Sequence, residues 1–172
     1  MGNVVLAGTM VLPPNTEPEA AVVVLAGSGP NGRDGRIRGF PAYRVIADHL
    51  ASEGVAVLLL DRRGVGGSGG DWRYETIPGR ARDALAAADF LRRRLPEAPV
   101  GLLGHSQGGW VAVEAAATRP QGIDFVILMA GPGESVREQI LTDAANQARL
   151  AGLSPRDVAR RGGPPRPLLR GG

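Results

Sequence analysis

Short runs of aliphatic and β-branched residues alternate along the chain with longer stretches in which apolar residues recur every three or four positions. Such runs are typical of strands buried in a sheet, and such stretches are typical of amphipathic helices. We expect strands at residues 4–12, 20–25, 55–60, 100–103 and 123–130. We expect helices at residues 41–53, 78–95, 110–118 and 135–152. Because strand and helix alternate, the predicted fold class is α/β, with a mainly parallel sheet and helices on both faces.

The same pattern divides the chain into three parts. Residues 1–134 hold the alternating elements and are predicted to form the α/β core. Residues 135–153 follow as a separate helical segment, in which Val136, Ile140 and Leu141 are apolar. Residues 154–172 are rich in Arg, Gly and Pro, which cannot build a helix or a central strand, so we expect a disordered tail there.

Composition fits one globular domain and excludes several kinds of site. The chain has 172 residues, of which 43% are hydrophobic, with no cysteine and two histidines. Disulfides and thiolate metal sites are therefore excluded, and we predict no metal site and no cofactor. No run of 18 apolar residues occurs and no signal peptide is evident, so we expect a cytoplasmic protein without a membrane partner.

The basic charge does not indicate a nucleic-acid partner. The formal net charge is +3, and all 20 basic residues are arginine, spread along the chain among 17 acidic residues. Only seven aromatic residues are present, too few for a base-stacking surface. We therefore expect no nucleic-acid binding.

One stretch carries a candidate for catalysis. Gly104-His105-Ser106-Gln107-Gly108 lies between a predicted buried strand and a predicted helix. A G-x-S-x-G sequence in that setting predicts a nucleophile elbow, with Ser106 on a tight turn that requires Gly104 and Gly108. A second match, Gly66–Gly70, follows its strand only after five intervening residues and opens no helix, so we interpret it as a glycine loop.

Four ordered motifs together resemble the α/β-hydrolase superfamily of serine hydrolases, and most closely bacterial esterases of the dienelactone-hydrolase and acyl-peptidase-like branch. The motifs lie at residues 26–35, 61–68, 104–109 and 130–133.

The resemblance implies a site for ester hydrolysis. Ser106 would attack a small carboxylic ester or acyl substrate and form an acyl-enzyme. The backbone N–H groups of Gln107 and Ser28 would form the oxyanion hole, where charge builds on the carbonyl oxygen. Asp61 and Arg63 match a motif that holds loops in the family.

The chain departs from the family in one respect. The family order is serine, then acid, then histidine, and no histidine follows Ser106. We expect His105 to serve packing and His49 to be a boundary residue of a helix. No acid or base is identified, and Glu134, after the last predicted strand, is only a weak candidate for the acid. The sequence therefore resembles a hydrolase truncated before its acid and histidine.

Three interpretations follow from this departure. The chain is an esterase of low activity, or an inactive hydrolase fragment that acts as a binding or interaction module, or it obtains a histidine from a partner chain. Under the second interpretation, residues 123–130 would form an exposed apolar edge strand that favours self-association.

Overall fold

The structure is a computed structural model that describes residues 4–154 and 156–157. The chain forms two compact units, Met1–Gly131 and Pro132–Gly172. The strands are β1 (Gly8–Val11), β2 (Ala20–Leu25), β3 (Arg36–Ile37), β4 (Phe40–Pro41), β5 (Val55–Leu60), β6 (Val100–His105) and β7 (Phe125–Met129). The α-helices are α1 (Ala42–Ser52), α2 (Ile77–Arg94), α3 (Gln107–Thr118) and α4 (Val136–Leu150).

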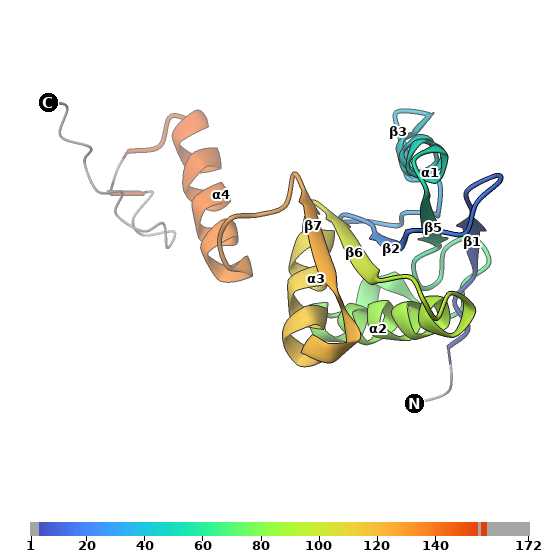
Figure 1. Cartoon of the computed structure of the whole chain (residues 1–172). Helices are drawn as coiled ribbons and strands as arrows, with labels where there is room; N and C mark the ends of the chain where they lie inside the picture. The colour runs from blue at the N-terminus through green and yellow to red at the C-terminus, as the bar shows by residue number, and fades with distance from the viewer. Residues whose placement is uncertain (1–3, 155, 158–172) are drawn as a thin grey trace, which may run out of the picture. The chain divides into compact units, whose positions relative to one another are not determined.

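The first unit is built on a five-stranded sheet in the order β1-β5-β2-β6-β7 (Figure 1). β2 pairs in parallel with both β5 and β6, β6 pairs in parallel with β7, and β1 is antiparallel to β5. The predicted α/β class with a mainly parallel sheet is confirmed. From β2 the chain continues to β5 on one side and later to β6 on the other, so a topological switch point lies at the carboxyl end of β2.

Side chains of the central strands alternate between two cores, as the period of two in a strand requires. On one face of β2, Val23 and Leu25 pack in a cluster with residues of α2 and α3. On the other face, Val22 and Val24 pack with Tyr43 and other residues around α1. Helices therefore cover both faces and fix the carboxyl ends of β2 and β6 side by side.

The last strand of the sheet differs from the prediction. Residues 123–130 were expected to form a buried strand, but β7 is an edge strand. Val126, Ile127 and Leu128 are 36%, 43% and 51% exposed. This matches the exposed edge expected under the interaction-module interpretation. An apolar run identifies a strand, whereas its place in the sheet depends on which strands pair with it.

The second unit contains α4. Ser135 caps this helix, because its hydroxyl accepts from the N–H of Glu138 while the Glu138 carboxylate accepts from the N–H of Ser135. Most of the tail predicted at residues 154–172 lies outside the described residues. No helix in the described part of the chain is long and apolar enough to span a membrane.

Candidate active site

Ser106 lies in a backbone conformation that L-residues rarely adopt. It is the residue between β6 and α3, with φ 52° and ψ −123°. Its N–H donates to the carbonyl of Met129 at 3.1 Å, and its carbonyl accepts from Gly109 N–H at 2.8 Å. A positive φ in a residue other than glycine costs free energy that the surrounding structure must offset. The turn therefore holds Ser106 in the strained geometry that a nucleophile elbow requires.

The two flanking glycines leave no room for a side chain. A Cβ atom on Gly104 would lie 2.4 Å from the carbonyl oxygen of Gly108. A Cβ atom on Gly108 would lie 2.1 Å from the carbonyl oxygen of Leu25 in β2. Both contacts are with backbone, which cannot move aside as a flexible side chain can. The close approach of α3 to β6 therefore explains the glycine at 104, and its close approach to β2 explains the glycine at 108.

The loop after β2 lies against the elbow. A Cβ atom on Gly27 would be 3.2 Å from Cβ of Ser106. The Asn31 side-chain amide donates to the carbonyl of Ser28 at 2.7 Å and to those of Gly27 and Gly29 at 3.3 and 3.2 Å. One side chain thus holds three successive carbonyls of this loop.

Ser28 and Gln107 line the same pocket of about 450 Å³. Gln107 is the first residue of α3, and N–H groups in the first turn of a helix have no acceptor within the helix. Both predicted oxyanion-hole residues therefore border one cavity beside the elbow. Arg62, Trp72, Glu75 and Arg80 line other parts of its wall.

Asp61, at the carboxyl end of β5, ties two loops to the sheet. Its carboxylate accepts from the N–H of Arg33 at 2.7 Å, from the Arg33 guanidinium at 2.6 Å and from the N–H of Gly67 at 3.0 Å. The Arg33 hydrogen bond is the main cause that lowers the pKa of Asp61 from 3.8 to about 2. Asp61 is 4% exposed, and both of its carboxylate oxygens accept hydrogen bonds in these contacts. Arg63 in turn pairs with Asp83 of α2 at 2.6 Å.

The serine of the second G-x-S-x-G match is part of this structural frame. Ser68 is buried, donates its hydroxyl proton to the carbonyl of Asp61 at 2.8 Å and accepts from the N–H of Ala7 at 2.9 Å. Its hydroxyl joins the N-terminal segment to the end of β5. These contacts give Ser68 a structural role and distinguish it from Ser106.

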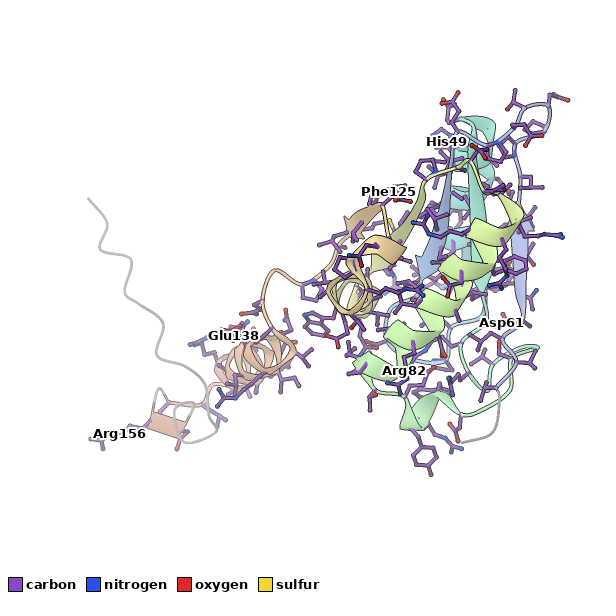
Figure 2. All side chains as sticks on the ribbon, turned by 60° about the horizontal axis from the view of Figure 1, so that its bottom comes forward. His49, Asp61, Arg82, Phe125, Glu138 and Arg156 are labelled. Carbon is purple, nitrogen blue, oxygen red and sulfur yellow. The ribbon has the colours of Figure 1, made fainter. Side chains whose placement is uncertain are left out.

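Neither histidine is placed as the base of a catalytic triad. Nδ1 of His105 lies 2.9 Å from the hydroxyl of Tyr43, which also accepts from the N–H of Gly27. His49 lies near the end of α1, close to the amino end of β5, whereas Ser106 follows the carboxyl end of β6. Figure 2 labels His49, and its side chain is exposed rather than at the boundary expected from the sequence. Glu134 belongs to the second unit.

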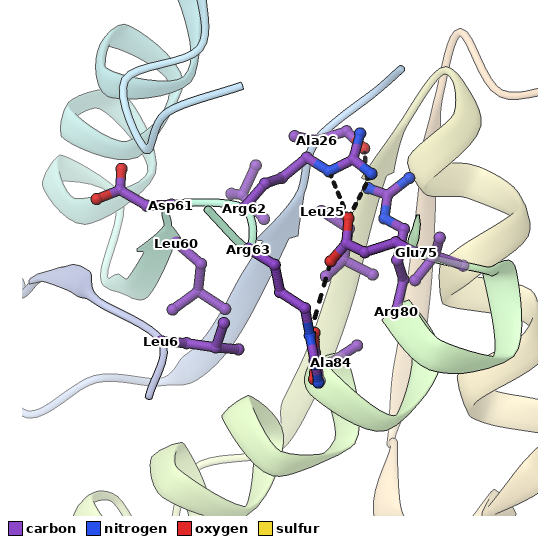
Figure 3. Close-up of a pocket in the computed structure, with 13 residues that line it drawn as sticks. Leu6, Leu25, Ala26, Leu60, Asp61, Arg62, Arg63, Glu75, Arg80 and Ala84 are labelled. Carbon is purple, nitrogen blue, oxygen red and sulfur yellow. Dashed lines mark hydrogen bonds and ion pairs between the residues drawn. The ribbon is translucent and has the colours of Figure 1, made fainter. Parts of the chain in front are cut away.

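A cluster of charged residues near the elbow was not predicted from the sequence (Figure 3). The Arg62 guanidinium pairs with Glu75, which lies 3.8 Å from Arg63, and Arg80 lies beside them. The sequence did hold a signal for Arg80. It lies one turn before Ala84 on the apolar face of α2, where a charged residue is unexpected. Among the described residues, no group of three or more His, Cys, Asp or Glu side chains could hold a metal ion.

A mainly parallel sheet covered on both faces, with a strained serine at a strand–helix turn and an adjoining loop after β2, is typical of the serine hydrolases of the α/β-hydrolase superfamily. The chain belongs within that class to the Hydrolase_4 family, serine aminopeptidase S33, whose model matches residues 16–157. The resemblance inferred from the motifs is thus confirmed.

Three similar proteins illustrate the relationship. Esterase EstD from Thermotoga maritima is 30% identical over 87% of this chain and 35% of its own length. The monoglyceride lipase of Rattus norvegicus is 32% identical over 67% of this chain and 36% of its own. The crystal structure of a dienelactone hydrolase from Anabaena variabilis matches with a TM-score of 0.60 at 27% identity, over 73% of this chain and 57% of its own. The chain therefore spans little more than a third of the length of these two curated relatives.

Proposed function

We propose that this chain carries the nucleophile and the oxyanion hole of a serine hydrolase acting on small carboxylic esters. The observation that carries the proposal is the backbone of Ser106, with φ 52° at a turn closed by Gly104 and Gly108. The names of the relatives, an esterase and a monoglyceride lipase, support an ester as the substrate.

In the proposed reaction, the oxygen of the Ser106 hydroxyl attacks the carbonyl carbon of the ester. The N–H groups of Ser28 and Gln107 donate to the oxygen that becomes negative, and each donor contributes roughly 3–4 kcal/mol in such sites. The C–O bond to the alcohol then breaks, and the alcohol leaves with a proton. Water adds to the acyl-enzyme, releases the carboxylic acid and restores the Ser106 hydroxyl.

The attack requires an acceptor for the hydroxyl proton. No histidine follows Ser106 in the sequence, and Nδ1 of His105 lies at hydrogen-bond distance from Tyr43. We therefore expect slow turnover from this chain alone. Hydrolases that lack triad residues retain about 10³–10⁴-fold acceleration over water from binding and the oxyanion hole.

Steady-state hydrolysis of p-nitrophenyl acetate tests the proposal. Ser106→Ala should lower the rate below that of the unchanged chain, leaving only the acceleration that binding and the oxyanion hole provide without a nucleophile. Ser52→Ala is the matched control, because Ser52 is an exposed serine at the end of α1 whose hydroxyl donates only to the carbonyl of His49. Equal rates for S106A and the unchanged chain would refute Ser106 as the nucleophile.

An interaction module is the second candidate function, favoured by the edge strand β7. Val126, Ile127 and Leu128 present an apolar and partly exposed edge beside the elbow strand β6. An edge of this kind is a template for pairing with another strand. We infer that a chain with no Ser106-dependent activity would act through this edge, by self-association or by binding a partner.

A further inference from the structure

One arginine of α2 is buried beside the loop and the helix that form the predicted oxyanion hole. Arg80 is 7% exposed. Its Nη2–H donates to the carbonyl of Ala26 at 2.5 Å, and its Nη1–H donates to Oε1 of Gln107 at 2.7 Å. Ala26 begins the loop that carries Ser28, and Gln107 directly follows Ser106. A single guanidinium therefore bridges the two parts of the site (Figure 3 shows its contact with Ala26).

The positive charge of Arg80 is attracted by Glu75 and Asp83 nearby, but neither carboxylate contacts it in an ion pair. Among the described residues, no carboxylate forms an ion pair with its guanidinium, whereas the neighbouring Arg62 is paired with Glu75. Burial, followed by repulsion from Arg62, lowers the pKa of Arg80 to about 10, so the group remains charged at neutral pH. Burying a charge that has no direct ion pair is costly, and apolar replacements of buried ions are often neutral or stabilising. Packing alone therefore gives no reason for an arginine at this position.

Arg62 supports the same loop through two further carbonyls. Its Nη1–H donates to the carbonyl of Gly29 at 2.7 Å and to that of Gly27 at 3.3 Å. Since a trans peptide is planar, its N–H points opposite to its carbonyl. The bond to Gly27 therefore directs the N–H of Ser28 away from Arg62. The carbonyls on both sides of this peptide are held as well, that of Ala26 by Arg80 and that of Ser28 by the Asn31 side-chain amide.

The geometry points to Arg80 as a positioning residue of the oxyanion hole, an inference that rests on the proposed function. Its guanidinium fixes the loop after β2 against the start of α3, so the N–H groups of Ser28 and Gln107 keep one relative arrangement. Its positive charge also favours negative charge that develops beside it. Donors accelerate acyl transfer only if they are already in place when that charge forms.

Replacing Arg80 by Met tests this inference. Methionine is an unbranched, apolar side chain that fills part of the same space. The change removes both hydrogen bonds and the charge. Arg82→Met is the matched control, because Arg82 lies in the same helix and is exposed. For hydrolysis of p-nitrophenyl acetate, we expect R80M to lower kcat by about 10²-fold with little change in KM. R82M should change neither constant.

A second variant and a second measurement keep the test decisive if R80M folds poorly. Arg80→Gln remains polar but is too short to bridge both acceptors, so it should show the same loss in kcat. Two-dimensional ¹H–¹⁵N spectra detect the link between the loop and α3 without requiring turnover. The amide signals of Ser28 and Gln107 should both shift in R80Q, and neither should shift in R82M.

The two sets of variants distinguish a failure of the role of Arg80 from a failure of the proposed function. If S106A lowers the rate while R80M and R80Q keep kcat within about twofold of the unchanged chain, the role of Arg80 is overturned and the proposed function stands. If S106A keeps full activity, the proposed function fails. The amide signals then test whether Arg80 links the loop to α3. Signals of Ser28 and Gln107 that do not shift in R80Q would overturn that role.

Discussion

Replacing Asp61 by Asn removes a buried negative charge from the point where two loops meet the end of β5. The carboxylate accepts three hydrogen bonds, two from Arg33 and one from the N–H of Gly67. An amide keeps the shape but has one oxygen, so its NH₂ group must face at least one of these donors. The remaining guanidinium of Arg33 is 30% exposed and can be hydrated in part.

The size of the effect follows from the pKa of Asp61, which is lowered from 3.8 to about 2 in the folded protein. That difference corresponds to about 2 kcal/mol of stability contributed by the ionised carboxylate. Because the pKa is lower in the folded state, the contribution is present above pH 4 and is lost as the pH falls through about 2. We therefore expect D61N to lower the free energy of unfolding by about 2 kcal/mol at pH 7.

Urea unfolding followed by circular dichroism between pH 7 and pH 3 measures this effect. Asp48→Asn is the control, because Asp48 forms an exposed ion pair with Arg44 at 2.8 Å. Such a pair is worth about 0.5 kcal/mol or less. The difference between D61N and the unchanged chain should shrink toward acid pH. Equal effects of D61N and D48N at pH 7 would refute the loop-holding role of Asp61.

Two further predictions concern the elbow and the sheet edge. Gly108→Ala places a Cβ atom 2.1 Å from the backbone of Leu25, so we expect a loss of about 3 kcal/mol or more in urea unfolding. Gly131→Ala, whose Cβ would meet nothing closer than 3.5 Å, is its control, and equal stability of the two variants would contradict the packing argument. We also propose that β7 mediates self-association, so Ile127→Lys should raise the monomeric fraction in sedimentation velocity. If the chain without the substitution is monomeric at every concentration measured, this proposal is contradicted.

The local pattern of apolar residues was sufficient to predict most strands of the sheet. The runs at 20–25 and 55–60 match β2 and β5 residue for residue, because strands buried on both faces need continuous apolar sequence. The pattern could not show that β7 is an edge, since that depends on pairing between distant strands. The short hairpin of β3 and β4 was missed because each of its strands has two residues, too few to show an alternation.

The candidate site was likewise predicted in its local part and not in its long-range contacts. The G-x-S-x-G spacing located the turn at Ser106, because glycine on both sides is a local requirement of the close packing. The supporting contacts of Arg62, Glu75 and Arg80 join loops and helices 13 to 54 residues apart in the sequence. No local pattern specifies which carbonyl a distant arginine reaches, although an arginine on the apolar face of α2 marks the place to look.

The central claim is that Ser106 forms an acyl-enzyme. Incubating the full chain with p-nitrophenyl acetate at neutral pH, quenching in acid and mapping the peptides by mass spectrometry tests it directly. The account predicts an acetyl group on Ser106 and its absence from that peptide in S106A. Acetylation only at other residues, with hydrolysis unchanged in S106A, would contradict the account.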